Sequence, residues 1–68
     1  MVKIVKMNQL FEKHNVNALM AEDCVIVNCG RIFKETVISV VNTLKAQGIK
    51  TGEYYWNDGI KAYIIPLI

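Results

Sequence analysis

The segment around Gly30 changes its hydrophobic period, and this change indicates that the chain combines strands with helices. Before the glycine, Cys24–Cys29 is largely apolar and rich in β-branched residues, which is typical of a central strand covered on both faces. After it, apolar residues recur at helical spacing and predict a helix over 31–47. Gly48 is placed to end this helix in a left-handed conformation, with Ile49 folding back onto the last turn.

The C-terminal part of the chain predicts a β-hairpin. Two apolar and aromatic stretches, Thr51–Trp56 and Ile60–Ile65, flank the turn-forming sequence Asn57–Gly59. Glycine at the third loop position is typical of a three-residue loop, in which a type I turn is followed by a left-handed residue. The resulting register pairs Trp56 with Ile60.

This register divides the hairpin into an inner and an outer face. The inner face, expected to pack on the long helix, contains Tyr54, Trp56, Ile60, Ala62 and Ile64. The outer face, expected to be exposed, contains Glu53, Tyr55, Lys61, Tyr63 and Ile65. A two-residue turn at Asp58–Gly59 would place Trp56 with Lys61, which separates apolar from polar residues less well, so we favour the three-residue loop.

The N-terminal third of the sequence is less regular. Val2–Met7 alternates weakly and fits either a short edge strand or the lead-in to a first helix. Asn8 fits an N-cap, and residues 8–14 are predicted to be helical. Beyond them, asparagines weaken the helical pattern, and an alternative makes 16–21 a strand that turns at Glu22–Asp23 into the next strand.

These elements give a weak strand followed by the order αβαββ. We therefore predict an α+β fold in one domain, residues 1–68, with a three- to four-stranded sheet, two helices on one face and a final hairpin. A parallel first strand would make the sheet mixed. The residues predicted to be buried together are Val25, Val27, Phe33, Val37, Val40, Leu44, Trp56 and Ile64.

Composition narrows the classes of partner. In 68 residues, of which 53% are apolar, the core is thin and some apolar surface remains, so we expect self-association as a homodimer or a protein partner. The net charge of +2 comes from scattered basic residues, which permits nucleic acid without requiring it. The sequence shows no signal-peptide pattern and only short apolar runs, so we expect a cytoplasmic protein with no membrane partner.

The sequence offers no convergent set of catalytic or metal-binding residues. His14, Cys24 and Cys29 are the soft metal ligands, yet they fall on a helix and on opposite faces of one strand. Cys29 precedes Arg31 near a predicted helix start, but no base lies beside it in the sequence. We therefore predict that the protein is not an enzyme, that both thiols are free, and that it holds no metal or cofactor.

The outer hairpin face is the candidate binding surface. Tyrosines beside lysines on a sheet can stack unpaired bases, whereas an apolar tail ending in Ile68 suits a protein partner. The predicted binding residues are Lys50, Glu53, Tyr55, Lys61, Tyr63 and Ile65. The favoured hypothesis is a small phage or mobile-element accessory protein that binds and modulates a host protein. The alternative is a small RNA- or DNA-binding module that uses the hairpin.

Overall fold

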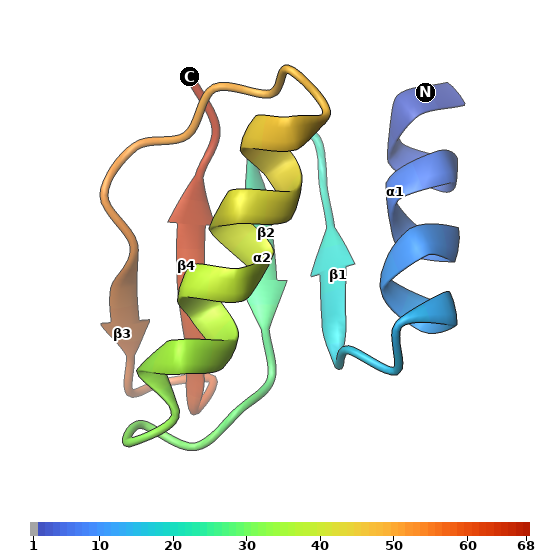
Figure 1. Ribbon diagram of the computed structural model, residues 1–68. Helices are drawn as coiled ribbons and strands as arrows, with labels where there is room; N and C mark the ends of the chain where they lie inside the picture. Colours follow the sequence, from blue (N-terminus) through green and yellow to red (C-terminus); the bar gives the residue numbers. More distant parts are fainter. Residues whose placement is uncertain (1) are drawn as a thin grey trace.

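A computed structural model of the chain describes residues 2–68 and shows one four-stranded antiparallel sheet, with one helix across a face of the sheet and the other beside its edge (Figure 1). The elements are α1 (Val2–Lys13), β1 (Ala18–Met20), β2 (Cys24–Val27), α2 (Lys34–Ala46), β3 (Tyr55–Asn57) and β4 (Ala62–Pro66). The strand order is β1-β2-β4-β3. The predicted α+β class, helix placement and final hairpin are confirmed. The predicted mixed sheet is wrong, since every neighbouring pair is antiparallel.

Residues Val2–Met7 are the first part of helix α1. The prediction of a weak edge strand there is therefore wrong, and the alternative, a lead-in to the first helix, is correct. The reason is spacing. Ile4, Met7 and Phe11 recur every three or four residues, and Met7 and Phe11 are both buried in the core. The alternative strand within 16–21 is also correct and forms β1, which pairs with β2.

Both helices end in the same backbone motif. At the end of α2, Gly48 has a positive φ of 76°, and the amide of Ile49 donates to the carbonyl of Leu44, as predicted. At the end of α1, Asn15 takes this role with a φ of 58°, and the amide of Val16 donates to the carbonyl of Phe11. Asparagine tolerates the left-handed conformation, so the residue that weakens the helical pattern is the one that ends the helix.

The core lies between the sheet and the two helices. From α1 and the sheet it contains Met7, Phe11, Met20, Val25, Val27, Tyr63 and Ile65; from α2 it contains Val37, Val40 and Leu44. Trp56 is half-buried against this cluster. The burial of Phe33 was predicted wrongly, because α2 begins at Lys34, three residues later than predicted, and the Phe33 side chain before it is 56% exposed.

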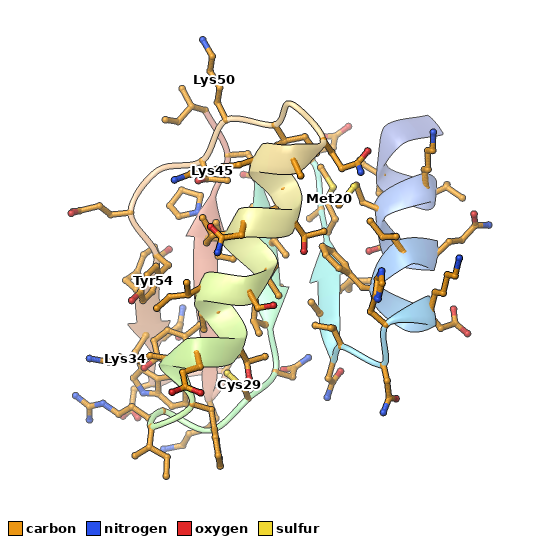
Figure 2. All side chains as sticks on the ribbon, viewed as in Figure 1. Met20, Cys29, Lys34, Lys45, Lys50 and Tyr54 are labelled. Carbon is orange, nitrogen blue, oxygen red and sulfur yellow. The ribbon has the colours of Figure 1, made fainter. Side chains whose placement is uncertain are left out.

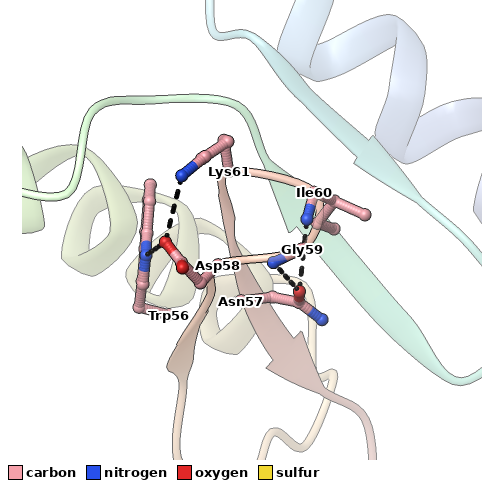
Figure 3. A network of polar contacts seen from close by, with 6 residues as sticks. All are labelled: Trp56, Asn57, Asp58, Gly59, Ile60 and Lys61. Atoms are coloured by element: carbon pink, nitrogen blue, oxygen red, sulfur yellow. Dashed lines mark hydrogen bonds and ion pairs between the residues drawn. The ribbon is translucent and has the colours of Figure 1, made fainter.

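The hairpin loop differs from the predicted three-residue loop (Figure 3). Asn57 pairs with Ala62, so four residues form the loop, and the left-handed residue is Lys61, with a φ of 56°, rather than Gly59. The Asn57 side-chain oxygen accepts hydrogen bonds from the amides of Gly59 and Ile60, at 2.9 and 3.3 Å. A side-chain cap on the loop therefore replaces the glycine conformation that the sequence favoured.

This loop shifts the hairpin register by an odd number of residues, so the residues of β4 lie on the opposite face from the predicted one, while those of β3 keep their predicted faces. Trp56 now pairs with Tyr63, and Tyr55 pairs with Ile64. Tyr63 and Ile65 were predicted to be exposed, but they are buried in the core on the helix side. Tyr63 packs edge-on against Trp56 and Tyr54, with ring centroids 5.1 and 5.8 Å apart. The observed register is favoured because it buries the large side chains of Tyr63 and Ile65 beneath α2.

The free edge of β1 is closed by a side chain of α1. The Asn8 side-chain oxygen accepts a hydrogen bond from the Met20 amide at 2.8 Å, and its nitrogen donates to the Met20 carbonyl at 3.5 Å. These two backbone groups point away from β2, because the neighbouring pair Leu19–Ile26 carries the hydrogen bonds of the ladder. Asn8 was predicted to be an N-cap; it instead lies within α1 and substitutes for a neighbouring strand.

Candidate functional site

The sheet face opposite the helices is the candidate site. Its centre is a row of four directly paired residues, one from each strand: Leu19, Ile26, Ile64 and Tyr55. We call this helix-free side of the sheet the open face and these four residues the apolar row. Figure 1 shows α2 crossing the other face and α1 lying beyond β1. The two ends of the row protrude, with Leu19 55% and Tyr55 52% exposed, whereas Ile64 between its neighbours is 8% exposed.

The strand residues around the apolar row carry no charge. Side chains alternate along each strand, so positions two residues away share the open face. Glu53, two residues before Tyr55, is exposed and charged; it lies just outside β3, as Asn17 and Ala21 lie just outside β1. On one side of the row the flanking positions are Asn17, Asn28, Ala62 and Asn57; on the other they include Ala21, Cys24 and Pro66. The open face is therefore apolar at its centre, and of the positions two residues from the row Glu53 alone carries a charge.

The six predicted binding residues do not form one surface. Tyr63 and Ile65 are in the core, whereas the other four are exposed. Lys50 lies at the end of the molecule opposite Lys34 and Cys29, and the hairpin loop with Lys61 lies at their end (Figures 1 and 2). The Lys61 ammonium is paired with Asp58 at 3.2 Å. Of the six, Tyr55 is the one that belongs to the apolar row.

Three residues of the apolar row were missed as binding residues: Leu19, Ile26 and Ile64. The signal for them was present in the sequence, because the strand Cys24–Val27 is apolar at successive positions and its pattern predicts cover on both faces. In the structure α2 and α1 cover one face only. Strand β4 repeats this pattern, with four consecutive buried residues from Ala62 to Ile65.

A second group of exposed apolar residues lies at the end of the molecule that carries the hairpin loop (Figure 1). Ile32 is 84% exposed beside Phe33 in the loop between β2 and α2, and Ile60 is exposed in the hairpin loop. The first loop is held by hydrogen bonds from the Tyr63 hydroxyl to the Arg31 carbonyl and from the Phe33 amide to the Gly30 carbonyl. In the sequence, Arg31 and Lys34 flank Ile32 and Phe33, and Lys61 follows Ile60.

The residues considered for metal binding and catalysis do not converge. His14 is exposed in the turn directly after α1, and Cys24 and Cys29 are free and half-buried. Within residues 2–68, no three His, Cys, Asp or Glu side chains cluster in a way that could hold a metal ion. Burial raises the pKa of both thiols, and at Cys24 the Asp23 carboxylate raises it further. This shift disfavours the nucleophilic thiolate.

We predict that both thiols react slowly with iodoacetamide near neutral pH. Because the folded protein raises their pKa, the thiolate fraction at a given pH is smaller than in the unfolded chain, and alkylation should accelerate only at higher pH. Alkylation rates measured by mass spectrometry from neutral to alkaline pH, with and without denaturant, test this. A fast reaction of Cys29 in the folded protein at neutral pH would contradict the prediction.

Two surface hollows lie away from the apolar row. One lies between α1 and α2, has a volume of 300 Å³ and is lined by residues that include Phe11, His14 and Thr43. The other, of 480 Å³, lies beyond the C-terminal end of α2 and includes Lys45, Lys50 and Ile68. Neither brings a nucleophile together with a base. In the part of the chain that the structure describes, neither helix is long and apolar enough to cross a bilayer.

The open face, an apolar surface supplied by all four strands, is thus the feature best suited to binding. Comparisons of the chain with protein-family models, with curated proteins and with solved structures found no match.

Proposed function

We propose that this protein is a small, non-enzymatic, cytoplasmic protein-binding module whose open face is the binding surface. The observation that carries the proposal is that β2 and β4 are apolar on both faces while the helices cover one. Strands of this kind are typical of sheets buried on both sides. A protein partner on the open face would complete that burial. An origin in a phage or mobile element stays a prediction from size and composition.

The charge distribution favours a protein partner over nucleic acid. A nucleic-acid surface needs cations that contact phosphates, and the strand positions of the open face carry none. The alternative placed Lys61 between two outward tyrosines, but Tyr63 is buried and Lys61 is paired with Asp58. Tyr55 alone remains as a stacking platform, and its paired neighbour is Ile64.

Affinity capture with matched variants tests the proposal. Leu19→Lys places a charge on the open face, whereas Val5→Lys places one on α1 at a residue of similar exposure, 58% against 55%. Each tagged variant is immobilised and exposed to a lysate of cells that express the untagged chain. The wild type and Val5→Lys should capture the same protein from this lysate, and Leu19→Lys should not. Leu19→Lys should lose the bound protein because binding would bury an unpaired lysine in an apolar interface.

Two outcomes would contradict the proposal. If Leu19→Lys retains the same partner as wild type, the open face is not the binding surface. If the purified protein binds an unspecific oligonucleotide with an affinity that falls steeply with salt, and Lys61→Ala weakens it, the nucleic-acid alternative is correct. Circular dichroism of each variant confirms that the helices and the sheet are retained.

A further inference from the structure

The hairpin loop contains a pair of residues at which the main chain can rearrange. Asp58 is followed by Gly59, whereas the other aspartate, Asp23, is followed by Cys24, and no asparagine of the chain precedes a glycine. The amide nitrogen that follows an aspartate can attack the side-chain carboxyl group, because this attack closes an unstrained five-membered ring. Glycine has no side chain to obstruct the attack and allows the main-chain torsions that it needs. Asp58–Gly59 is therefore the pair in this sequence that is best suited to the reaction.

The reaction needs no oxidant, reductant or cofactor. The Gly59 nitrogen forms a bond to Cγ of Asp58 in its acid form and gives up its proton, while the carbon–hydroxyl bond breaks. One water molecule leaves and a succinimide ring remains. Water then opens the ring: attack at Cγ restores aspartate, whereas attack at the main-chain carbonyl of Asp58 gives isoaspartate, in which the chain continues through the side-chain carbons. The product therefore has the same mass as the starting chain.

The Asp58 carboxylate is exposed and only weakly restrained. Its side chain is 79% exposed, and that of Lys61, its ion-pair partner at 3.2 Å, is 74% exposed. An ion pair this exposed contributes little, because water screens it. The Trp56 indole nitrogen donates to the same carboxylate oxygen at 3.4 Å, which is longer than is usual for a hydrogen bond (Figure 3). The carboxyl group is therefore accessible to the water that opens the ring.

The attacking amide is held more firmly than the carboxyl group. The Gly59 amide donates to the Asn57 side-chain oxygen at 2.9 Å, and the Ile60 amide donates to the same oxygen at 3.3 Å. A Cβ at position 59 would lie only 3.2 Å from this oxygen, so the Asn57 side chain sits directly against the glycine. The attack requires the amide to turn its nitrogen towards the Asp58 side chain and to lose its proton. The hydrogen bond to Asn57 opposes both changes.

We propose that Asp58 is a site of spontaneous isoaspartate formation in this protein, and that the Asn57 side chain slows the reaction by holding the Gly59 amide. The reactive carboxyl group, its nucleophile and the group that restrains the nucleophile are three successive residues of one loop (Figure 3). This modification site lies outside the apolar row and does not depend on the proposed function.

The product changes the part of the chain that sets the hairpin register. Isoaspartate lengthens the main chain by one carbon between residues 58 and 59, inside the loop that closes on the pair Asn57–Ala62. The next pair is Trp56–Tyr63, and its register keeps Tyr63 in the core. The converted protein should therefore be less stable than the unconverted protein and should unfold at a lower concentration of denaturant.

Ageing of the purified full chain tests the proposal. Wild type and variants are incubated at about pH 5, where carboxyl groups keep a protonated fraction, and digestion with mass spectrometry that separates the isomers measures isoaspartate at each aspartate. The wild type should accumulate it at Asp58 and not at Asp23. Asn57→Ala should accumulate it about 5-fold faster, the rate equivalent of one hydrogen bond. Asn57→Asp keeps an acceptor oxygen and should stay near the wild-type rate.

Two further samples make the result decisive. Asp58→Glu would need a six-membered ring and should form no isomer at this position, and wild type in denaturant should convert faster than the folded protein. A folded wild type that forms no isoaspartate at Asp58, while the denatured chain does, overturns the site. Equal rates in wild type and Asn57→Ala overturn the role of Asn57. If circular dichroism shows that Asn57→Ala is unfolded, equal rates in folded and denatured wild type overturn that role instead.

Discussion

Replacing Tyr63 with alanine is expected to lower the free energy of unfolding by about 3–5 kcal/mol, the usual cost of removing a large aromatic ring from a core. The side chain is 3% exposed. It packs edge-on against Tyr54 and Trp56, and its hydroxyl donates to the Arg31 carbonyl. A loss of this size is a large share of the stability of a domain of 68 residues. Chemical denaturation followed by tryptophan fluorescence measures it.

Two control variants separate the causes of the loss. Tyr63→Phe keeps the ring and removes the hydrogen bond to Arg31, so it should cost about 1 kcal/mol. Tyr55→Ala removes a tyrosine that is 52% exposed on the open face and should change stability by less than Tyr63→Ala. If Tyr55→Ala proved the more damaging of the two alanine variants, the hairpin register described above would be incorrect.

The burial of Tyr63 also shows what the sequence could and could not predict about the hairpin. The hairpin itself was predicted correctly, because apolar residues and turn formers mark it, but its first strand is Tyr55–Asn57 rather than Thr51–Trp56, and its second strand begins at Ala62 rather than Ile60. The register was not predicted correctly, because Gly59 is the obvious left-handed residue and Lys61 has no such preference. The choice depends on packing between the hairpin, β2 and α2, which no local pattern records.

Long-range contacts also explain the error at the start of the chain. Val2–Met7 can be read with a period of two or of nearly four, and so short a segment does not decide between them. The burial of Met7 against residues of the sheet and α2 decides for the helix. By contrast, Val37, Val40 and Leu44 were predicted correctly, since a helix of 13 residues repeats its pattern over several turns.

The candidate site could be predicted only in part from the sequence, because its composition depends on long-range strand pairing. Tyr55 was predicted to face outward and does lie on the open face, but it was grouped with Tyr63 and Ile65 instead of Ile64. Membership of a sheet face follows from register, and an odd shift moves every residue of a strand to the other face. The apolar character of β2 at every position did indicate that both of its faces are to be covered.

Replacing Asn8 with leucine is expected to lower the free energy of unfolding by about 1–3 kcal/mol, because two backbone groups of Met20 lose their partners. Leucine branches at the same carbon as asparagine and is the better helix former by about 0.5 kcal/mol, so α1 itself should not weaken. The decrease in the free energy of unfolding therefore measures how much the Asn8 side chain contributes by closing the edge of β1. Gln9→Leu, at an exposed neighbouring position, is the matched control and should be nearly neutral.

Amide hydrogen exchange at Met20 distinguishes the loss of this hydrogen bond from a general loss of stability in Asn8→Leu. In the wild type this amide donates to the Asn8 side chain at 2.8 Å and should be protected. In Asn8→Leu it should exchange quickly, while the Ile26 amide, at the centre of the ladder, stays protected until the protein unfolds. An open edge is also a template for pairing with another chain, so Asn8→Leu should aggregate more readily on storage. Unchanged protection at Met20 would show that Asn8 does not close this edge.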